Sequence, residues 1–217
     1  MRKVTKQSLA EIAKKMLTIS ENEQKWFVGR TKYYDSNGVF VCENHDGIDL
    51  IKVLQVSPGS SYTGGDEEGD SIAWSSASME EKKNIIDTLG MIEGISKGSI
   101  DYPAGMSADV SGQVGVTYTT INGVTTVTGT SNIRINVMGP FSGRNIFTHY
   151  NLSYNDAMEC ILHEKFHKSD FTYLGSDRRE YEALLAMQAS PYFNGMDKDR
   201  RDGVTEQIAE YKRKLGL

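Results

Sequence analysis

Hydrophobic and polar residues alternate in a strand-like way after the N-terminal thirty residues. Tyrosine and valine recur in residues 31–42, and Asn37-Gly38 within this segment is a strong signal for a tight turn. Residues 48–56 alternate enough to supply another strand. Residues 57–71 are rich in glycine, serine and acidic side chains, a composition typical of a linker or loop. We therefore expect a β-hairpin region and a linker over residues 31–71.

A second β-rich region lies in the middle of the chain. Residues 115–121 and 124–129 are separated by Asn122-Gly123, a dipeptide that favours the turn of a hairpin. Residues 132–137 read Asn-Ile-Arg-Ile-Asn-Val, and this alternation predicts a neighbouring strand. The pattern thus predicts an antiparallel hairpin with one further strand beside it.

Helical spacing of apolar residues appears first at residues 6–17, which predict a short N-terminal helix. Ser78 and Glu81 fit a capping box, in which each side chain accepts a hydrogen bond from the backbone of the other residue. The helix expected after this box carries apolar residues at helical spacing, namely Ile85, Ile86, Leu89 and Ile92.

The last third of the chain has mostly helical patterns. Ser153 and Asp156 are placed to cap a helix over residues 154–167. A second helix is expected over residues 177–190, and Pro191 predicts a break after it.

This order of strands followed by helices favours an α+β fold, with a small antiparallel sheet before the two later helices. The expected organisation has three parts. Residues 1–30 form an N-terminal helix, residues 31–71 the hairpin region and linker, and residues 72–217 the remaining domain.

Composition narrows the function classes. The chain has 217 residues and a formal net charge of -5, which argues against a general nucleic-acid binder. No apolar stretch approaches the length needed to span a bilayer, so we expect no membrane span. Cys42 and Cys160 are too far apart to match a zinc knuckle or a dense disulfide framework.

Residues 17–29 resemble the leader segments of exported bacterial peptides, which end in a double glycine. Here Gly29 is followed by Arg30 instead of a second glycine. The resemblance implies export from a bacterial cell. The alternative is an N-terminal helix that packs on the domain.

The chemistry is concentrated in His163-Glu164-Lys165-Phe166-His167, which spells H-E-x-x-H within the helix predicted at 154–167. Histidines four residues apart lie on one face of a helix, so both imidazoles can reach one metal ion. Zinc suits neutral imidazole, and a catalytic zinc takes three protein ligands and a water. Glu164 would then accept the proton of that water and pass it to the leaving amine.

The next helix offers two candidates for the third ligand, Glu180 and Glu182. With Leu184 at the centre of the apolar stripe, Glu180 falls inside the stripe and Glu182 points nearly opposite. A carboxylate within an apolar stripe costs free energy unless a cation compensates it, which favours Glu180. Glu180 also follows Asp177 by three residues, so a capping-box role is the alternative.

H-E-x-x-H followed by a short loop and a helix that opens with Glu-x-x-Ala resembles the gluzincin branch of zinc metallopeptidases. The similarity is greatest to the small metallopeptidase domains of bacterial effectors and toxins. The resemblance implies that His163, His167 and Glu180 bind Zn²⁺ and that Glu164 is the catalytic base. It also implies that residues 72–217 form the peptidase domain.

The expected partner is a peptide or protein substrate, which the family aligns along an edge strand by main-chain hydrogen bonds. The strand expected at 132–137 is the candidate for this role. Lys165 and Lys168 depart from the family, which usually has uncharged residues at these positions.

Two other classes of function stay open on the sequence. One is a non-catalytic secreted interaction module whose histidines are structural or whose metal site is inactive. The other is a zinc amidase that acts on cell-wall peptides with the same site, because loops determine which substrate is bound.

Overall fold

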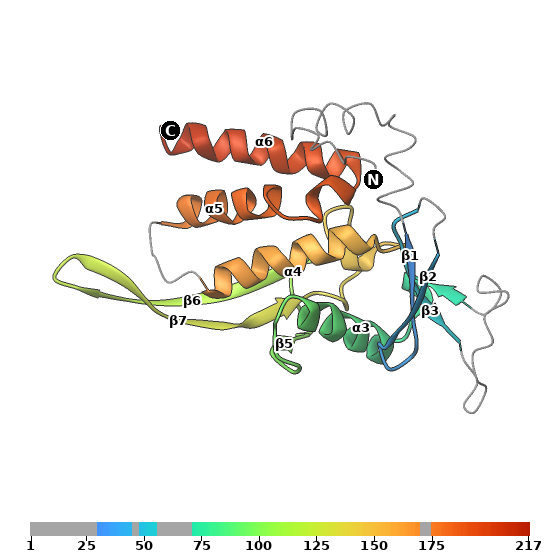
Figure 1. Ribbon diagram of the computed structural model, residues 1–217. Helices are drawn as coiled ribbons and strands as arrows, with labels where there is room; N and C mark the ends of the chain where they lie inside the picture. Colours follow the sequence, from blue (N-terminus) through green and yellow to red (C-terminus); the bar gives the residue numbers. More distant parts are fainter. Residues whose placement is uncertain (1–29, 45–47, 56–70, 170–174) are drawn as a thin grey trace, which may run out of the picture.

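The computed structural model describes residues 30–44, 48–55, 71–169 and 175–217, which form the predicted α+β fold (Figure 1). The helix predicted at 6–17, the leader-like segment and nearly all of the linker lie outside these residues. The division of the chain into three regions stays a prediction, and so does export. No helix in the described part of the chain is long and apolar enough to cross a membrane.

The first sheet contains the hairpin predicted around Asn37-Gly38, which is confirmed. Its strands occur in the spatial order β2-β1-β3-β4, with bounds β1 Thr31–Tyr34, β2 Phe40–Asn44, β3 Ile51–Leu54 and β4 Ser71–Ala73. The β1–β2 and β3–β4 pairs are antiparallel, whereas β1 and β3 run parallel. Gly38 has a positive φ of 76°, and the Asp35 carboxylate accepts hydrogen bonds from two backbone N–H groups of the turn.

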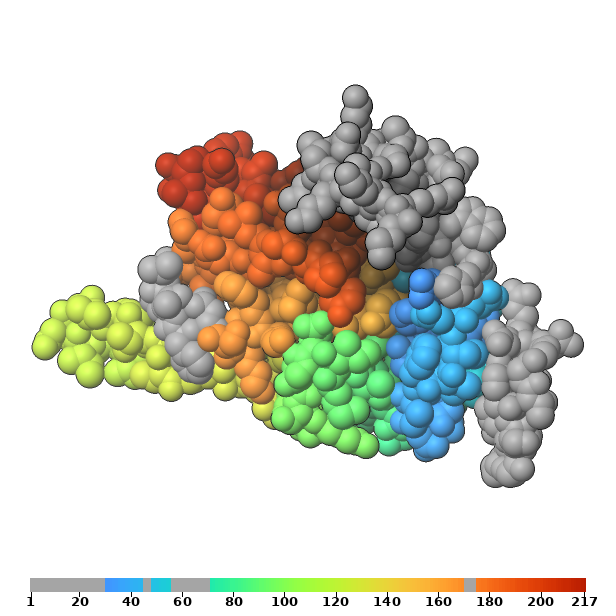
Figure 2. All heavy atoms as spheres, viewed as in Figure 1, coloured from blue at the N-terminus to red at the C-terminus, as the bar shows by residue number. Residues whose placement is uncertain are grey.

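The second sheet contains the other predicted hairpin. Its strands occur in the order β5-β7-β6, with bounds β5 Ile100–Asp101, β6 Gly112–Ile121 and β7 Val124–Ile135. Asn122 and Gly123 both have positive φ, at 52° and 78°, which suits the two-residue turn of a hairpin. The far end of this hairpin stands out from the body of the molecule (Figure 2).

The prediction of a separate strand at residues 132–137 is wrong. Residues 124–135 form one continuous strand, because the two register irregularities in its pairing with β6, one of them beside Ser131, do not end the strand. Ile133 pairs with Ile100 on one side and with Val114 on the other, so this segment is central in its sheet. The edge strand on this side of the sheet is β6.

Helix α3, Met79–Ile92, connects the two sheets and begins at the predicted capping box. The Ser78 hydroxyl accepts from the Glu81 N–H at 3.3 Å, and the Glu81 carboxylate accepts from the Ser78 N–H at 2.7 Å. The apolar stripe is buried except for Ile92, whose side chain at the helix end is 54% exposed. The helix therefore begins where the sequence predicts, and most of its apolar stripe is buried.

The three remaining helices are stacked over the second sheet (Figure 1). They are α4 Tyr154–Ser169, α5 Ser176–Gln188 and α6 Lys198–Lys214. Helix α4 packs on β6 and β7, α5 packs on α4, and α6 packs on α5. The break predicted near Pro191 is present between α5 and α6, where a short 3-10 helix spans Phe193–Gly195.

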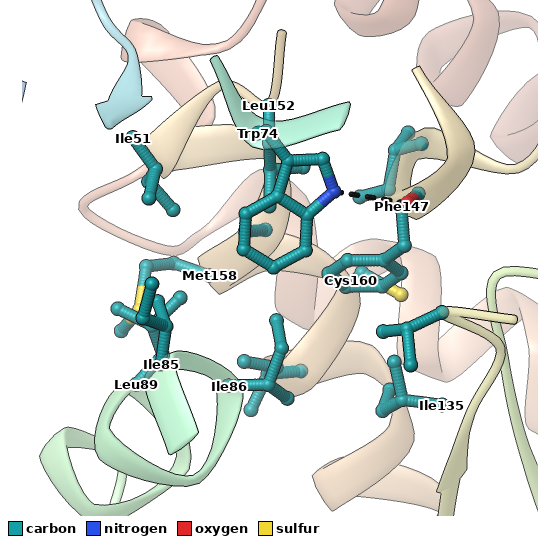
Figure 3. Close-up of a cluster of buried hydrophobic side chains, with 14 of the residues drawn as sticks. Ile51, Trp74, Ile85, Ile86, Leu89, Ile135, Phe147, Leu152, Met158 and Cys160 are labelled. Carbon is teal, nitrogen blue, oxygen red and sulfur yellow. Dashed lines mark hydrogen bonds between the residues drawn. The ribbon is translucent and has the colours of Figure 1, made fainter. Parts of the chain in front are cut away.

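The main core lies where the first sheet, α3, α4 and β7 meet (Figure 3). Trp74 is fully buried there, and its indole N–H donates to the carbonyl oxygen of Phe147 at 2.9 Å. Burial of an indole is favourable only when its N–H finds an acceptor, and this bond supplies one. The core thereby fixes the first half of α4, where Ala157, Met158 and Ile161 are fully buried.

Candidate metal centre

The motif helix α4 begins where the sequence predicts. The Ser153 hydroxyl accepts from the Asp156 N–H at 3.1 Å, as an N-cap does. Asp49, which precedes β3, accepts from the Ser153 hydroxyl at 2.6 Å and from the Asn155 N–H at 2.8 Å. The start of the helix is therefore held to the first sheet, which fixes the direction in which its later turns point.

One buried stripe of α4 leads from the core to the candidate site. Cys160, Glu164 and His167 follow each other at helical spacing and are all buried. Cys160 is part of the hydrophobic core. His163 is half-buried beside this stripe, so the two histidines share one inward-facing side of the helix.

His163, His167 and Glu180 converge between the end of α4 and the first turns of α5. The two histidine Nε2 atoms are 3.0 Å apart. One carboxylate oxygen of Glu180 lies 3.4 Å from Nε2 of His163, and the other lies 3.2 Å from Nε2 of His167. These three residues form a group that could hold a metal ion, and the described ranges contain no other such group of histidine, cysteine or acidic side chains.

The spacing of these atoms fits a tetrahedral metal site. Ligand atoms about 2.0 Å from one tetrahedral ion lie about 3.3 Å from each other. The 3.0 Å distance between the two Nε2 atoms is close to this value, and so are the distances of 3.2 and 3.4 Å from these atoms to the two different oxygens of Glu180. Two imidazole nitrogens and a carboxylate are also a donor set that zinc prefers. The Nδ1 atom of His163 is buried and has no hydrogen-bond partner, so this ligand lacks the supporting contact that ligating histidines usually make.

Glu180 lies beside the two histidines, on the side that its place in the apolar stripe predicts. The alternative, a capping box of Asp177 and Glu180, does not form. Gly175, not Asp177, is the N-cap residue of α5, and a glycine has no side chain that could cap this end of the helix. Glu182 instead pairs with Arg178 at 2.5 Å, one turn earlier on α5. Burial by itself would raise the pKa of Glu180, but hydrogen bonds to the two histidines lower that pKa well below its ordinary value. The carboxylate is therefore charged beside the imidazoles.

Glu164 lies next to this group with a very different environment. Its side chain is 5% exposed, and its Oε2 atom has no hydrogen-bond partner. Burial, and then the negative charge of Glu180, raises the pKa of Glu164 to about 8. A carboxyl group with a pKa near neutrality can both accept and donate a proton at physiological pH.

No pattern along the chain indicates the residue that accommodates Glu164. Gly112, at the start of β6, lies so close that an ideal Cβ built on it would be 2.6 Å from Cγ of Glu164. Any side chain at this position would overlap the carboxyl group. A glycine at a strand start is usually read as a break in a pattern, and only the fold reveals this contact.

The group opens into a cavity of about 590 Å³. One wall is the edge strand β6, from Gly112 to Val116, with Tyr118 beyond it. The opposite wall is formed by α4 and the first turn of α5, with His163, Glu164, His167, Ser176, Arg179 and Glu180. The site is thus a groove between an open strand edge and the helices that carry the candidate ligands.

Other residues near the motif have structural contacts. His149 contacts the Ser142 carbonyl oxygen through Nε2 at 3.1 Å, so this loop histidine is held away from the metal group. Lys165 pairs with Glu93 at 3.6 Å, and Lys168 donates to the Asn132 side chain at 3.2 Å. The two lysines that depart from the family pattern are therefore bound outside the cavity, and neither lines it.

Comparisons of the chain with protein-family models, with curated proteins and with solved structures give no match. What the fold and the site define is an α+β protein with a His-His-Glu group that could hold a metal ion.

Proposed function

We propose that this chain is a zinc-dependent metallopeptidase that hydrolyses peptide bonds. The observation that carries the proposal is the convergence of His163, His167 and Glu180 beside the buried carboxyl group of Glu164. Three zinc-type donors and one proton-transferring group in a single groove are the parts that this hydrolysis needs.

In this proposal His163, His167 and Glu180 bind the zinc ion. Zinc held by three protein ligands lowers the pKa of a bound water to about 7 and polarises a substrate carbonyl. The negative charge of Glu180 offsets part of the charge of the cation. Gluzincin-like peptidases, which the motif resembles, divide these roles in the same way.

Glu164 is the proposed general base and then the general acid. Its pKa of about 8 lies near neutral pH, so it can take a proton from the attacking water and return it to the leaving amine. Burial keeps bulk water from exchanging that proton, and Gly112 leaves the carboxyl group the space it occupies.

The peptide would lie along β6. This strand is the edge of its sheet and forms one wall of the cavity from Gly112 to Val116. An extended peptide can add to such an edge through main-chain hydrogen bonds, which would place its carbonyl groups beside the metal group. This role replaces the one expected for residues 132–137, because residues 132–135 belong to the central strand β7 and residues 136–137 lie outside the sheet.

The test is hydrolysis of a mixed peptide library by the zinc-loaded protein, by its chelator-treated form and by Glu164→Gln. We expect cleavage that is lost on chelation, is restored by zinc and falls at least about 100-fold in Glu164→Gln while the zinc content stays unchanged. Glu182→Gln is the matched control, since Glu182 pairs with Arg178 outside the cavity lining. Stoichiometric zinc without cleavage of any peptide would instead support a non-catalytic binding module.

A further inference from the structure

A buried positive charge lies in the wall of the groove next to the candidate ligands. Arg179 is 5% exposed and lines the cavity. Its Nη2 atom donates to the carbonyl oxygen of His167 at 2.8 Å, whereas its Nη1 atom is buried without a hydrogen-bond partner. No ion pair joins Arg179 to an acidic side chain in the described ranges. A buried guanidinium with an unused donor edge is costly unless an anion completes it.

The backbone N–H groups of the first turn of α5 add partial positive charge to this corner, and Asp177, the acidic residue of that turn, is exposed and does not line the cavity. Gly175, with φ of 94°, is the N-cap residue of the helix and offers no side chain to cap it. The N–H groups of a first helical turn carry a partial positive charge and favour anions. Ser176, the first residue of α5, is exposed and lines the same cavity as Arg179.

A purely structural role for Arg179 accounts for only part of this arrangement. His167 is in the last turn of α4, where backbone carbonyls lack helical partners and a cation is favourable. The bond from Nη2 satisfies that need. It leaves Nη1 unpaired, and it does not explain why the uncapped start of α5 faces the cavity beside it.

We propose that Arg179, Ser176 and the N-terminus of α5 form a subsite that binds a carboxylate of the peptide substrate. This inference rests on the proposed function, and it names the substrate class as peptides with a carboxylate close to the cleaved bond. The carboxylate is either a chain terminus or an Asp or Glu side chain. Glu164 and Glu180 line the same cavity, so a planar, singly charged group is accommodated better than a doubly charged phosphate.

Binding to zinc-loaded Glu164→Gln tests the subsite without turnover. Three peptides share one neutral sequence: one has a free C-terminus, one has an amidated C-terminus and a single Glu, and one is amidated without Glu. We expect at least one of the two carboxylate peptides to bind about 10-fold or more tightly than the third. The tighter of the two identifies the source of the carboxylate. Equal affinity for all three would overturn the subsite.

Two variants on the same background separate binding from folding. Arg179→Met should abolish the carboxylate preference and leave the neutral peptide unchanged, with Arg178→Met as the matched control because Arg178 pairs with Glu182. Ser176→Asp should also abolish the carboxylate preference. It should preserve the melting temperature, since an acidic side chain at a helix start is stabilising. Ser176→Ala, which removes only the hydroxyl, should preserve the melting temperature and reduce the carboxylate preference less than Ser176→Asp does. A preference that survives both Arg179→Met and Ser176→Asp contradicts the proposal.

Wild-type turnover of the same peptides distinguishes the two proposals. Hydrolysis without carboxylate preference would leave the peptidase standing and overturn the subsite. Carboxylate-selective binding without hydrolysis would support the subsite and overturn the peptidase. Absence of both binding and hydrolysis would overturn both.

Discussion

Gly112 and Glu164 share a single space across the groove. An ideal Cβ on Gly112 would lie 2.6 Å from Cγ and 2.9 Å from Oε1 of Glu164, so the carboxyl group occupies the place of the missing side chain. The backbone of Gly112 does not have a positive φ, so only this contact requires a glycine. The strand thus sets the position of the proposed base.

Gly112→Ala should displace Glu164 while leaving the metal ligands in place. We expect peptide hydrolysis to fall by about 100-fold, because a misplacement of about 1 Å has that effect on a catalytic group. The zinc content should not change. Gly129→Ala on the neighbouring strand β7 is the control, since a Cβ there would meet nothing within 4 Å and Gly129 does not line the cavity.

The same contact has a readout that does not depend on activity. Gly112→Ala should lower the free energy of unfolding by about 1–3 kcal/mol in the wild-type background, where two side chains would compete for one space. In a Glu164→Ala background the cost should be smaller, because the space is vacant. An equal cost in both backgrounds would show that Glu164 does not occupy that space.

Trp74 provides a test of the core that supports α4. Trp74→Phe removes the indole N–H that donates to Phe147 and leaves a void in a fully buried position. We expect the free energy of unfolding to fall by about 2–4 kcal/mol in chemical denaturation. Ile121→Thr, at a hairpin position that is 67% exposed, should change it by no more than about 0.5 kcal/mol. Similar effects of the two substitutions would contradict the assigned core.

Glu159 gives the fold a dependence on pH. Its side chain is fully buried, its Oε2 atom has no partner, and a hydrogen bond from Ser190 reaches its other oxygen. Burial, and to a smaller extent the negative charges of Asp156 and Glu93, raise the pKa of Glu159 to about 7, although the hydrogen bond from Ser190 lowers it. The folded state therefore holds this proton more tightly than the unfolded chain. Its contribution to stability is fully present below pH 4.5 and is lost as pH rises through about 7.

Glu159→Gln should remove this loss. In metal-free protein the free energy of unfolding should fall between about pH 5 and about pH 8, and the variant should reduce that fall by up to about 3 kcal/mol. Glu210→Gln is the control, because Glu210 is a surface residue paired with Lys214 and its pKa is lowered. Parallel pH profiles for wild type and Glu159→Gln would rule out this role.

Local signals in the sequence were sufficient for much of the fold. The capping box at Ser78, the cap at Ser153 and both Asn-Gly turns use neighbours only a few residues apart, and all four are confirmed. The apolar stripe of α5 likewise separates Glu180, which lies beside the histidines, from Glu182, which does not.

Features that depend on distant residues were not predictable. The parallel pairs of β1 with β3 and of β5 with β7 join separate segments, so no periodicity within one segment indicates them. The same pairing makes residues 132–135 central and exposes β6 as the edge, which reverses the expected substrate strand. The contact between Gly112 and Glu164 is of the same kind, since neither residue indicates the other along the chain.

The central claim is that His163, His167 and Glu180 hold a zinc ion. The most direct measurement is the zinc content and zinc affinity of wild type, Glu180→Ala and Glu182→Ala after equal exposure to zinc. We predict one zinc per chain in wild type and in Glu182→Ala, and an affinity weakened by more than about 100-fold in Glu180→Ala, because loss of a ligand costs more than loss of a supporting contact. Full zinc content with unchanged affinity in Glu180→Ala, or no zinc in wild type, would contradict the claim.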